Sequence, residues 1–152
     1  MTSKSVGILG SGAWGCALAH AFSIAGNEVM LWGRSAETVN EINESHENKI
    51  YLKGLTLDNG VIATTNLEAV CKTDILVLAI PTQQVRHVTR TIQQYIKSNI
   101  PVISSAKGFE LETGRLISEI LAETLTNTNI GCLLYTSPSP RDRSLSRMPS
   151  SA

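Results

Sequence analysis

The chain has 152 residues, a formal net charge of +0 at pH 7 and a hydrophobic fraction of 42%. This length is enough for one domain with its own core. A chain without net charge gives no electrostatic reason to expect nucleic acid or an anionic membrane as a partner. No apolar run is long enough to cross a bilayer, so we expect neither nucleic-acid binding nor membrane insertion.

The first residues and the cysteines indicate a compartment. Residues 1–9 lack the long apolar core of a signal peptide. The three cysteines, Cys16, Cys71 and Cys132, lie far apart in the sequence. Such cysteines are typical of reduced thiols rather than of a disulfide framework or a metal site. We therefore expect a cytoplasmic protein without a bound metal.

A glycine-rich turn follows the first apolar run of the chain. Gly10, Gly12 and Gly15 form a G-x-G-x-x-G pattern between residues 6–9 and a helix-like stretch at 16–26. In a dinucleotide site the first glycine permits a sharp turn, the second lets a pyrophosphate approach the backbone, and the third lets the helix pack closely on the strand. The free N–H groups of the helix then face the phosphates. The pattern predicts a dinucleotide site, and the alternative is a tight turn without a ligand.

The rest of the chain alternates short apolar runs with helical patterns. This alternation predicts β-α-β units and a parallel sheet. The expected strands are residues 5–9, 28–32, 61–64, 74–80, 101–105 and 129–134. The expected helices are residues 16–26, 36–45, 66–71, 83–97 and 116–125, with a loop at 48–57. The fold class is therefore α/β, a Rossmann-like doubly wound parallel sheet.

Apolar spacing gives the expected helices an inward face. In the stretch 16–26 the residues expected to face inward are Ala17, Leu18, Ala21, Phe22 and Ala25. In the stretch 36–45 we expect Val39 and Ile42 to face inward and Ser35 to be the N-cap.

The residues after the second strand bear on the choice of cofactor. NAD-binding folds often place Asp or Glu there to hold the ribose 2′-hydroxyl. This chain has Arg34 in the segment Trp-Gly-Arg-Ser instead, so no carboxylate repels a 2′-phosphate, and Arg34 can pair with one or stack on adenine. The segment favours NADP over strict NAD use. The alternative is that Arg34 is a solvated charge at a helix start.

Two further segments follow the central strands, where ligands bind in sheets of this kind. Pro81 ends the run 74–80 and would stiffen a loop beside the nicotinamide ribose, or it marks only a strand-to-helix turn with Thr82 as the N-cap. Lys107 follows the run 101–105, and its charge and three donors suit a phosphate or a polarised carbonyl. The alternative for Lys107 is a surface turn.

The nearby acidic residues and the histidines have no predicted catalytic role. We expect Glu110 and Glu112 to be solvated or to lie at a helix start. His20, His46 and His87 share no metal-ligand spacing and are expected to be ordinary surface or partly buried residues.

The composition changes at the end of the chain. Residues 132–152 hold three of the five prolines and are rich in Ser and Arg. The few apolar residues of this segment cannot bury enough surface to offset the conformational entropy lost on ordering. We therefore expect the segment to be disordered. The segment also resembles translated sequencing-adapter ends, and we therefore expect a non-native tail after an incomplete cofactor-binding domain at 1–131. A basic arm that binds RNA or is phosphorylated is the alternative.

Together these segments resemble the N-terminal domain of bacterial NAD(P)-dependent glycerol-3-phosphate dehydrogenase. The matching segments are 10–19, 29–34, 48–54 with Leu57, 79–82, 106–110 and 113–115. The resemblance runs from about residue 5 to about residue 130. It is specific because the Asn-x-x-Tyr-Leu and Lys-Gly-x-Glu pieces recur in order with the glycine turn.

The resemblance implies NADP or NAD as cofactor and a small phosphate ester as substrate. By the resemblance, Ala13, Trp14, Arg34 and Lys107 would contact the cofactor. The glycine turn and the position after the run 74–80 add Gly10, Ser11, Gly12, Gly15 and Pro81 to the expected cofactor-binding residues. Lys107 would also contact the phosphate of the substrate. The intact enzyme would reduce dihydroxyacetone phosphate to sn-glycerol 3-phosphate for glycerophospholipid synthesis, with a homodimer as an open option.

Two departures from the family's pattern matter. Cys16 stands where the family commonly has Thr, and the family's Ser-Gly-Pro segment after the sixth strand is absent. The C-terminal helical domain, which carries the family's acid/base lysine, is absent too, so we expect a truncated chain that binds cofactor without turnover. The alternatives are another two-domain reductase of the ketopantoate or 6-phosphogluconate type and a non-catalytic module that senses NAD(P).

Overall fold

The computed structural model describes residues 3–133, and the predicted tail lies almost wholly outside them. The strands of its main sheet are β1 (Ser5–Leu9), β2 (Glu28–Trp32), β5 (Val61–Thr64), β6 (Ile75–Leu78), β7 (Pro101–Ser104) and β8 (Asn129–Cys132). The helices are α1 (Ala13–Ile24), α2 (Ala36–Ser45), α3 (Leu67–Val70), the 3₁₀ helix η1 (Thr82–Gln84), α4 (Val85–Ile92) and α5 (Ile117–Thr124). None of these helices is long and apolar enough to span a membrane.

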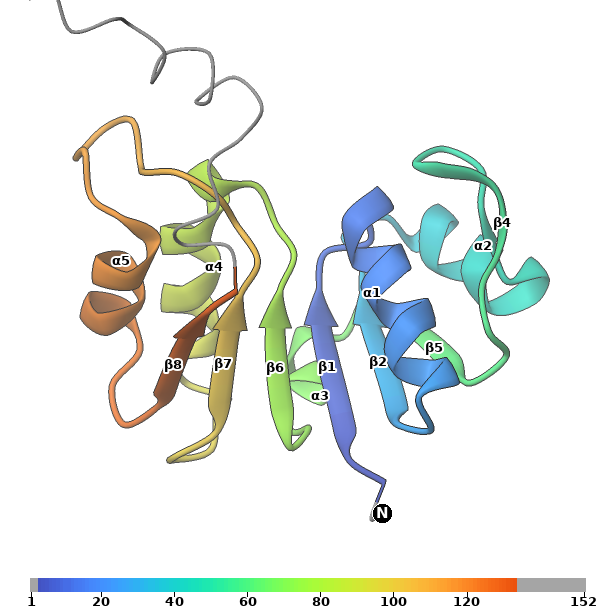
Figure 1. Cartoon of the computed structure of the whole chain (residues 1–152), viewed down its shortest axis with the longest axis horizontal. Coiled ribbons are helices and arrows are strands. Elements are labelled where there is room, and N and C mark those ends of the chain that lie inside the picture. Colours follow the sequence, from blue (N-terminus) through green and yellow to red (C-terminus); the bar gives the residue numbers. More distant parts are fainter. Residues whose placement is uncertain (1–2, 134–152) are drawn as a thin grey trace, which may run out of the picture.

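The main sheet has six strands in the order β5-β2-β1-β6-β7-β8, and all neighbouring pairs are parallel. The carboxyl ends of the strands therefore lie along one edge of the sheet (Figure 1). The strand order reverses between β1 and β6, which makes this pair the topological switch point where α/β sheets bind ligands. The predicted doubly wound sheet is confirmed.

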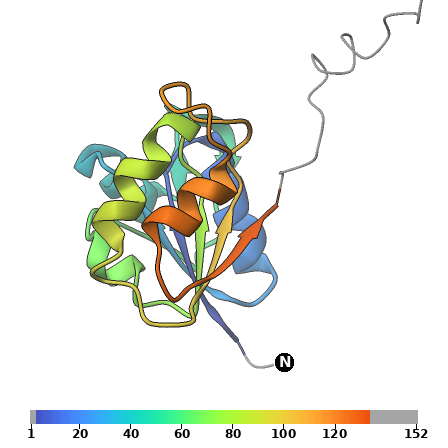
Figure 2. The same cartoon turned by 90° about the vertical axis from the view of Figure 1, so that its left-hand side faces the viewer.

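Helices cover both faces of the sheet, and alternate residues of each strand serve the two sides. In β6, Val77 packs into the core with residues of α1 and α2, while Leu76 and Leu78 pack with residues of α3, α4 and α5. Figure 1 shows α1 in front of the sheet and α3 behind it. Figure 2, turned by 90°, shows α1 and α4 on opposite sides. Burial on both faces explains why the central strands have continuous apolar runs.

The inward face predicted for the first helix is only partly correct, because Leu18 and Phe22 pack against the core but are not the residues that are fully buried. The residues of α1 that are buried are Gly15, Cys16, Ala19 and Ser23. Ala21 and Ala25 are exposed, and Leu18 and Phe22 are only partly buried. Small side chains lie against the sheet because they let the helix approach it closely, so the larger ones lie at the flanks. In α2, by contrast, Val39 and Ile42 are buried as predicted, and the Ser35 side chain accepts a hydrogen bond from the amide of Thr38 as an N-cap.

Two other predicted elements differ from the structure. The segment 48–57, predicted as a loop, contains an antiparallel hairpin of β3 (Glu47–Asn48) and β4 (Leu52–Thr56). The predicted long helix 83–97 is divided, because η1 precedes α4 and α4 ends at Ile92. Neither difference changes the sheet, but both alter the edge where the strands end.

Candidate nucleotide-binding site

The glycine turn after β1 is shaped by backbone contacts. Gly10 has a φ of 119°, which side chains rarely tolerate, and its amide donates a hydrogen bond of 3.0 Å to the carbonyl oxygen of Trp32. A Cβ atom on Gly15 would overlap the carbonyl oxygen of Gly10. A Cβ atom on Gly12 would meet no heavy atom within 4 Å. The turn therefore needs Gly10 and Gly15 for its own packing, whereas Gly12 leaves open space.

The start of α1 is a suitable place for an anion. Gly12 is the N-cap, and among the described residues no side chain caps the helix. The first backbone bond of the helix joins the amide of Cys16 to the carbonyl of Gly12 at 3.0 Å. The amides before Cys16 thus lie in the turn that helices leave without internal partners. Together with the positive end of the helix dipole, they form a site for phosphate groups.

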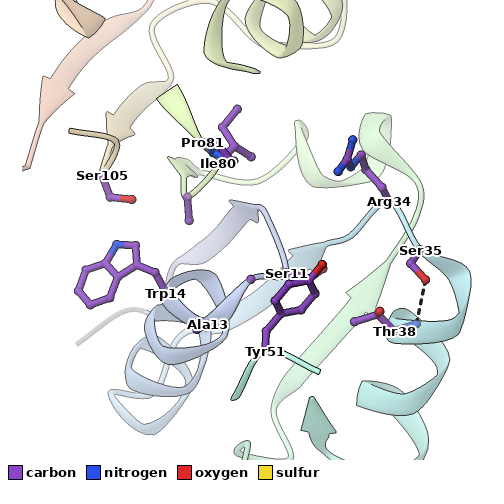
Figure 3. Close-up of a pocket in the computed structure, with 12 residues that line it drawn as sticks. Ser11, Ala13, Trp14, Arg34, Ser35, Thr38, Tyr51, Ile80, Pro81 and Ser105 are labelled. Atoms are coloured by element: carbon purple, nitrogen blue, oxygen red, sulfur yellow. Dashed lines mark hydrogen bonds between the residues drawn. The ribbon is translucent and has the colours of Figure 1, made fainter. Parts of the chain in front are cut away.

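A pocket of about 460 Å³ opens over this turn at the switch point (Figure 3). Its lining comes from the segments that follow β1, β2, β6 and β7, from the first turns of α1 and α2 and from the β3–β4 hairpin: Ser11, Gly12, Ala13, Trp14, Arg34, Ser35, Thr38, Tyr51, Ala79, Ile80, Pro81 and Ser105. Figure 3 shows Trp14 and Ser105 on one side and Arg34 on the other. The pocket thus lies over the start of α1, with the cationic group of Arg34 on one side.

The residues predicted for the cofactor fall into three groups. Six of them line the pocket: Ser11, Gly12, Ala13, Trp14, Arg34 and Pro81. Gly10 and Gly15 lie behind it and shape the turn. Lys107 is exposed on the loop after β7 and is not part of the lining. Their contacts with a cofactor remain predictions.

Sequence reasoning missed half of the lining. The residues it did not name as cofactor contacts are Ser35, Thr38, Tyr51, Ala79, Ile80 and Ser105. The predicted strand ends gave a signal for Ala79, Ile80 and Ser105, because ligands lie beside the carboxyl ends of parallel strands. Tyr51 belongs to the Asn-x-x-Tyr-Leu piece, but it could not be assigned to the pocket because its segment was predicted as a loop with no defined position.

Asn48, at the end of β3, connects the hairpin to the glycine turn. Its side chain is fully buried, and its Nδ2 donates to the carbonyl oxygen of Ser11 at 2.8 Å and to the Sγ of Cys16 at 3.2 Å. Its Oδ1 accepts a hydrogen bond of 3.1 Å from the amide of Tyr51. The Asn48 side chain therefore fixes the position of the glycine turn relative to the backbone of Tyr51, which lines the pocket.

Cys16 is fully buried beneath the glycine turn. Its Sγ lies 3.5 Å from the carbonyl oxygen of Ser11, to which the thiol donates. Burial raises the pKa of the Cys16 thiol, so the group stays neutral beneath the turn. All three cysteines are free.

Contacts between the loop after β7 and the segment after β6 show that two predictions were wrong. Glu110 is not solvated, because only 5% of it is exposed and its carboxylate receives a bidentate hydrogen bond from Arg86 at 2.8 and 2.9 Å. Arg86, and secondly the hydroxyl of Thr113, holds the pKa of the Glu110 carboxyl below its usual range. Thr82 is not an N-cap, since its hydroxyl donates to the carbonyl oxygen of Lys107 at 2.6 Å. Both side chains are used by contacts between segments far apart in the sequence.

A sheet of this order, with an open glycine turn and a pocket at its switch point, defines a Rossmann-type nucleotide-binding domain. The family described as NAD-dependent glycerol-3-phosphate dehydrogenase N-terminus matches residues 5–139. The chain belongs to this family. That result sets aside the ketopantoate and 6-phosphogluconate alternatives.

Individual relatives agree with the family match. A protein from Sphingopyxis alaskensis named glycerol-3-phosphate dehydrogenase (NAD(P)+) 2 is 40% identical over 129 residues, which cover 84% of this chain and 38% of that protein. A solved structure of glycerol-3-phosphate dehydrogenase from Plasmodium falciparum has a TM-score of 0.75 and 31% identity, covering 86% of this chain and 39% of its own. The enzyme from Coxiella burnetii has a TM-score of 0.79 at 24% identity, with coverage of 86% and 40%, and supports the fold. The chain thus spans about two fifths of the length of these relatives.

Proposed function

We propose that this chain is the cofactor-binding part of a glycerol-3-phosphate dehydrogenase that interconverts dihydroxyacetone phosphate and sn-glycerol 3-phosphate with NAD or NADP. The observation that carries the proposal is the uncapped start of α1 beneath the pocket, in a chain of this family. The product of the intact enzyme, sn-glycerol 3-phosphate, is the phosphate ester from which glycerophospholipids are made. The free cysteines support a cytoplasmic location.

The pocket fits a dinucleotide. Gly12 leaves room for a diphosphate to approach the amides of α1, and a side chain there would occupy that room. Arg34 takes part in no ion pair among residues 3–133, so its charge is available to a ribose phosphate or to adenine. The opposite end of the pocket, beside Pro81 and Ser105, is left for the nicotinamide.

The cofactor, when bound, supplies or accepts the hydride. The chain's own residues bind and orient the two reactants, which lowers the entropic part of the barrier. The turn would hold the diphosphate, and Pro81 bounds the pocket with a fixed backbone angle. Lys107, on the loop after β7, would hold the phosphate of the substrate. We infer that proton transfer belongs to the part of the relatives' length that this chain does not span.

The test is a titration of the 152-residue chain with NADH and NADPH, followed by fluorescence. We expect saturable binding of a cofactor and no reduction of dihydroxyacetone phosphate. A folded chain, as judged by circular dichroism, that shows no saturable response to either cofactor would contradict the proposal. Measurable turnover would contradict the view that the chemistry needs further residues.

Arg34→Asp tests the choice of cofactor. Because a hydrogen bond to a charged group contributes about 1.5–3 kcal/mol, we expect NADPH affinity to fall by roughly ten-fold or more. NADH affinity should change much less, since only NADPH has the 2′-phosphate. Equal losses for the two cofactors would assign Arg34 a general role, such as stacking on adenine.

A further inference from the structure

Lys107 lies on a loop that contains no helix and only one isolated β-bridge, between Phe109 and Leu116. The Lys107 loop, residues 105–116, joins β7 to α5, and its lysine is exposed. A long side chain on such a loop samples many positions, and ordering it opposes ligand binding. The contacts that fix this loop therefore bear directly on how well the lysine can bind a phosphate.

The segment after β6 holds the backbone of the Lys107 loop at three points. The hydroxyl of Thr82 donates to the carbonyl oxygen of Lys107 at 2.6 Å. The Nε2 of Gln83 donates to the carbonyl oxygen of Phe109, two residues after Lys107, at 3.2 Å. The Oε1 of Gln83 accepts from the amide of Leu111 at 3.0 Å. These contacts fall on Lys107 itself and on two residues that follow it in the sequence.

An ion pair made by Arg86, at the start of α4, anchors the same loop. Arg86 binds the carboxylate of Glu110 through two nitrogens, and its third nitrogen binds Glu123 of α5 at 2.8 Å. The side chain of Arg86 is 15% exposed and that of Glu110 is 6% exposed, so solvent screens this pair little. The hydroxyl of Thr113 donates to the same carboxylate at 2.5 Å.

We propose that Thr82, Gln83 and Arg86 form a clamp that sets the position of Lys107 and so determines how tightly this lysine holds a phosphate group. The inference rests on the proposed function, in which Lys107 is a ligand of the cofactor and the substrate. The clamp follows Pro81, which lines the pocket, so one short segment both bounds the pocket and positions the lysine. Thr82, Gln83 and Arg86 are positioning residues, because they act through Lys107.

Thr82 offers a matched pair of variants. Thr82→Val removes the hydroxyl at nearly constant volume, and Thr82→Ser keeps the hydroxyl. The affinity of the full chain is measured for NADH and, at saturating NADH, for sn-glycerol 3-phosphate. Lys107→Ala identifies which of the two ligands reports on the lysine. For that ligand, Thr82→Val should weaken binding by roughly 2- to 10-fold, as expected for one hydrogen bond, while Thr82→Ser stays near wild type.

A double-mutant cycle separates positioning from general stability. In the Lys107→Ala background, Thr82→Val should have no further effect on affinity, because the residue that it positions is already gone. Arg86→Lys should act in the same direction as Thr82→Val, since an ammonium cannot make the bidentate contact. Thermal unfolding midpoints of the two Thr82 variants should agree closely.

Four results would overturn the inference, and they differ in what else they overturn. A wild-type chain that binds neither cofactor removes the proposed function and the clamp together. Unchanged affinity for both ligands in Lys107→Ala removes the role of the lysine. A normal affinity in Thr82→Val, with a clear loss in Lys107→Ala, removes the clamp and leaves the proposed function intact. An equal loss from Thr82→Val with and without Lys107 shows that Thr82 acts on the pocket by another route.

Discussion

The glycine turn and the Lys107 loop both follow a central strand at the same edge of the sheet, but they are held in different ways. In the turn, the backbone of Gly10 fits between Gly15 and the strand end at Ala79, so the absence of side chains sets its shape. In the Lys107 loop, side chains of η1 and α4 hold the backbone through hydrogen bonds and an ion pair. One region is fixed by close packing, and the other by polar contacts between distant segments.

This difference decides which region can be recognised in the sequence. A turn fixed by packing requires glycine at a set spacing, and that spacing is local and visible. A loop fixed by contacts over some 25 residues requires only that Thr82 and Lys107 come together, which no local pattern records. The two regions should therefore respond differently to substitution.

The largest effect is expected in the turn, from a pair of glycine substitutions. Gly15→Ala places a Cβ atom on the carbonyl oxygen of Gly10, and a clash with backbone cannot be relieved by a side-chain rotation. We expect a loss of about 3 kcal/mol or more in the free energy of unfolding. Gly12→Ala meets open space, so it should fold normally. Its methyl group lies where a diphosphate would approach, so NADH affinity should fall by roughly ten-fold or more.

Urea unfolding and NADH titration of both variants check this prediction. The informative result is the dissociation of the two effects, with stability lost in Gly15→Ala and affinity lost in Gly12→Ala. If both variants lost stability equally, the space over Gly12 would not be open, and the distinction between the two glycines would fail.

Asn48 is an exception to the difference between the two regions. Its side chain makes a polar contact over 37 residues within the glycine turn, which is otherwise fixed by close packing. Asn48→Ala removes the donor to the carbonyl of Ser11 and the acceptor for the amide of Tyr51. Leaving such buried groups without partners costs about 1–3 kcal/mol. We expect this loss of stability together with weaker NADH binding, since both sides of the pocket lose their common support.

Asn43 provides the matched control for Asn48. Its side chain also joins two elements, donating to the carbonyl of Ala63 at 2.9 Å and accepting from the amide of Ala63 at 2.8 Å, but it is not part of the pocket lining. Asn43→Ala should lower stability and leave NADH affinity unchanged. Similar losses of affinity in both variants would show that any loosening of α2 or the hairpin weakens the site, without a specific role for Asn48.

Most of the sheet could be predicted from the sequence, because each strand has its own apolar run bounded by turn residues. Ser5–Leu9 and Glu28–Trp32 were predicted to the residue. The inward face of α1 could not be predicted from apolar spacing, since the helix packs through small residues. The hairpin of β3 and β4 was missed because its pairing is irregular, with a register shift at Asn48.

The candidate site was predictable where a single residue type is required and unpredictable where a partner is required. Gly12, Arg34 and Pro81 lie at the pocket as their spacing indicated. Glu110 was misjudged because a carboxylate in a polar loop is usually solvated, and only the fold brings Arg86 to it. Buried charges are tolerated when they are paired, and pairing is a property of the tertiary structure.

The smallest effect is expected in the Lys107 loop and appears as a dependence on pH. Arg86 holds the pKa of Glu110 in the folded chain below its ordinary value of 4.5. A carboxyl group with a lowered folded-state pKa stabilises the fold above its unfolded-state pKa, and this contribution is lost as the pH falls through the folded-state pKa. Stability should therefore decrease on acidification below pH 4.5, in part through this residue.

Glu110→Gln isolates that part, because the amide has nearly the same shape and does not titrate. Asp58 and Asp74, whose pKa values are also lowered, titrate alike in both proteins. Glu123 shares Arg86 with Glu110, and Arg86 also lowers its pKa, so Glu123→Gln and the double variant complete the comparison. The difference in unfolding free energy between wild type and variant should be largest near neutral pH and should shrink as the pH falls, which denaturant titrations at a series of pH values can measure. A difference that does not change with pH would mean that the charge of Glu110 contributes nothing to the loop. The loop would then be held by shape and neutral hydrogen bonds, as the glycine turn is.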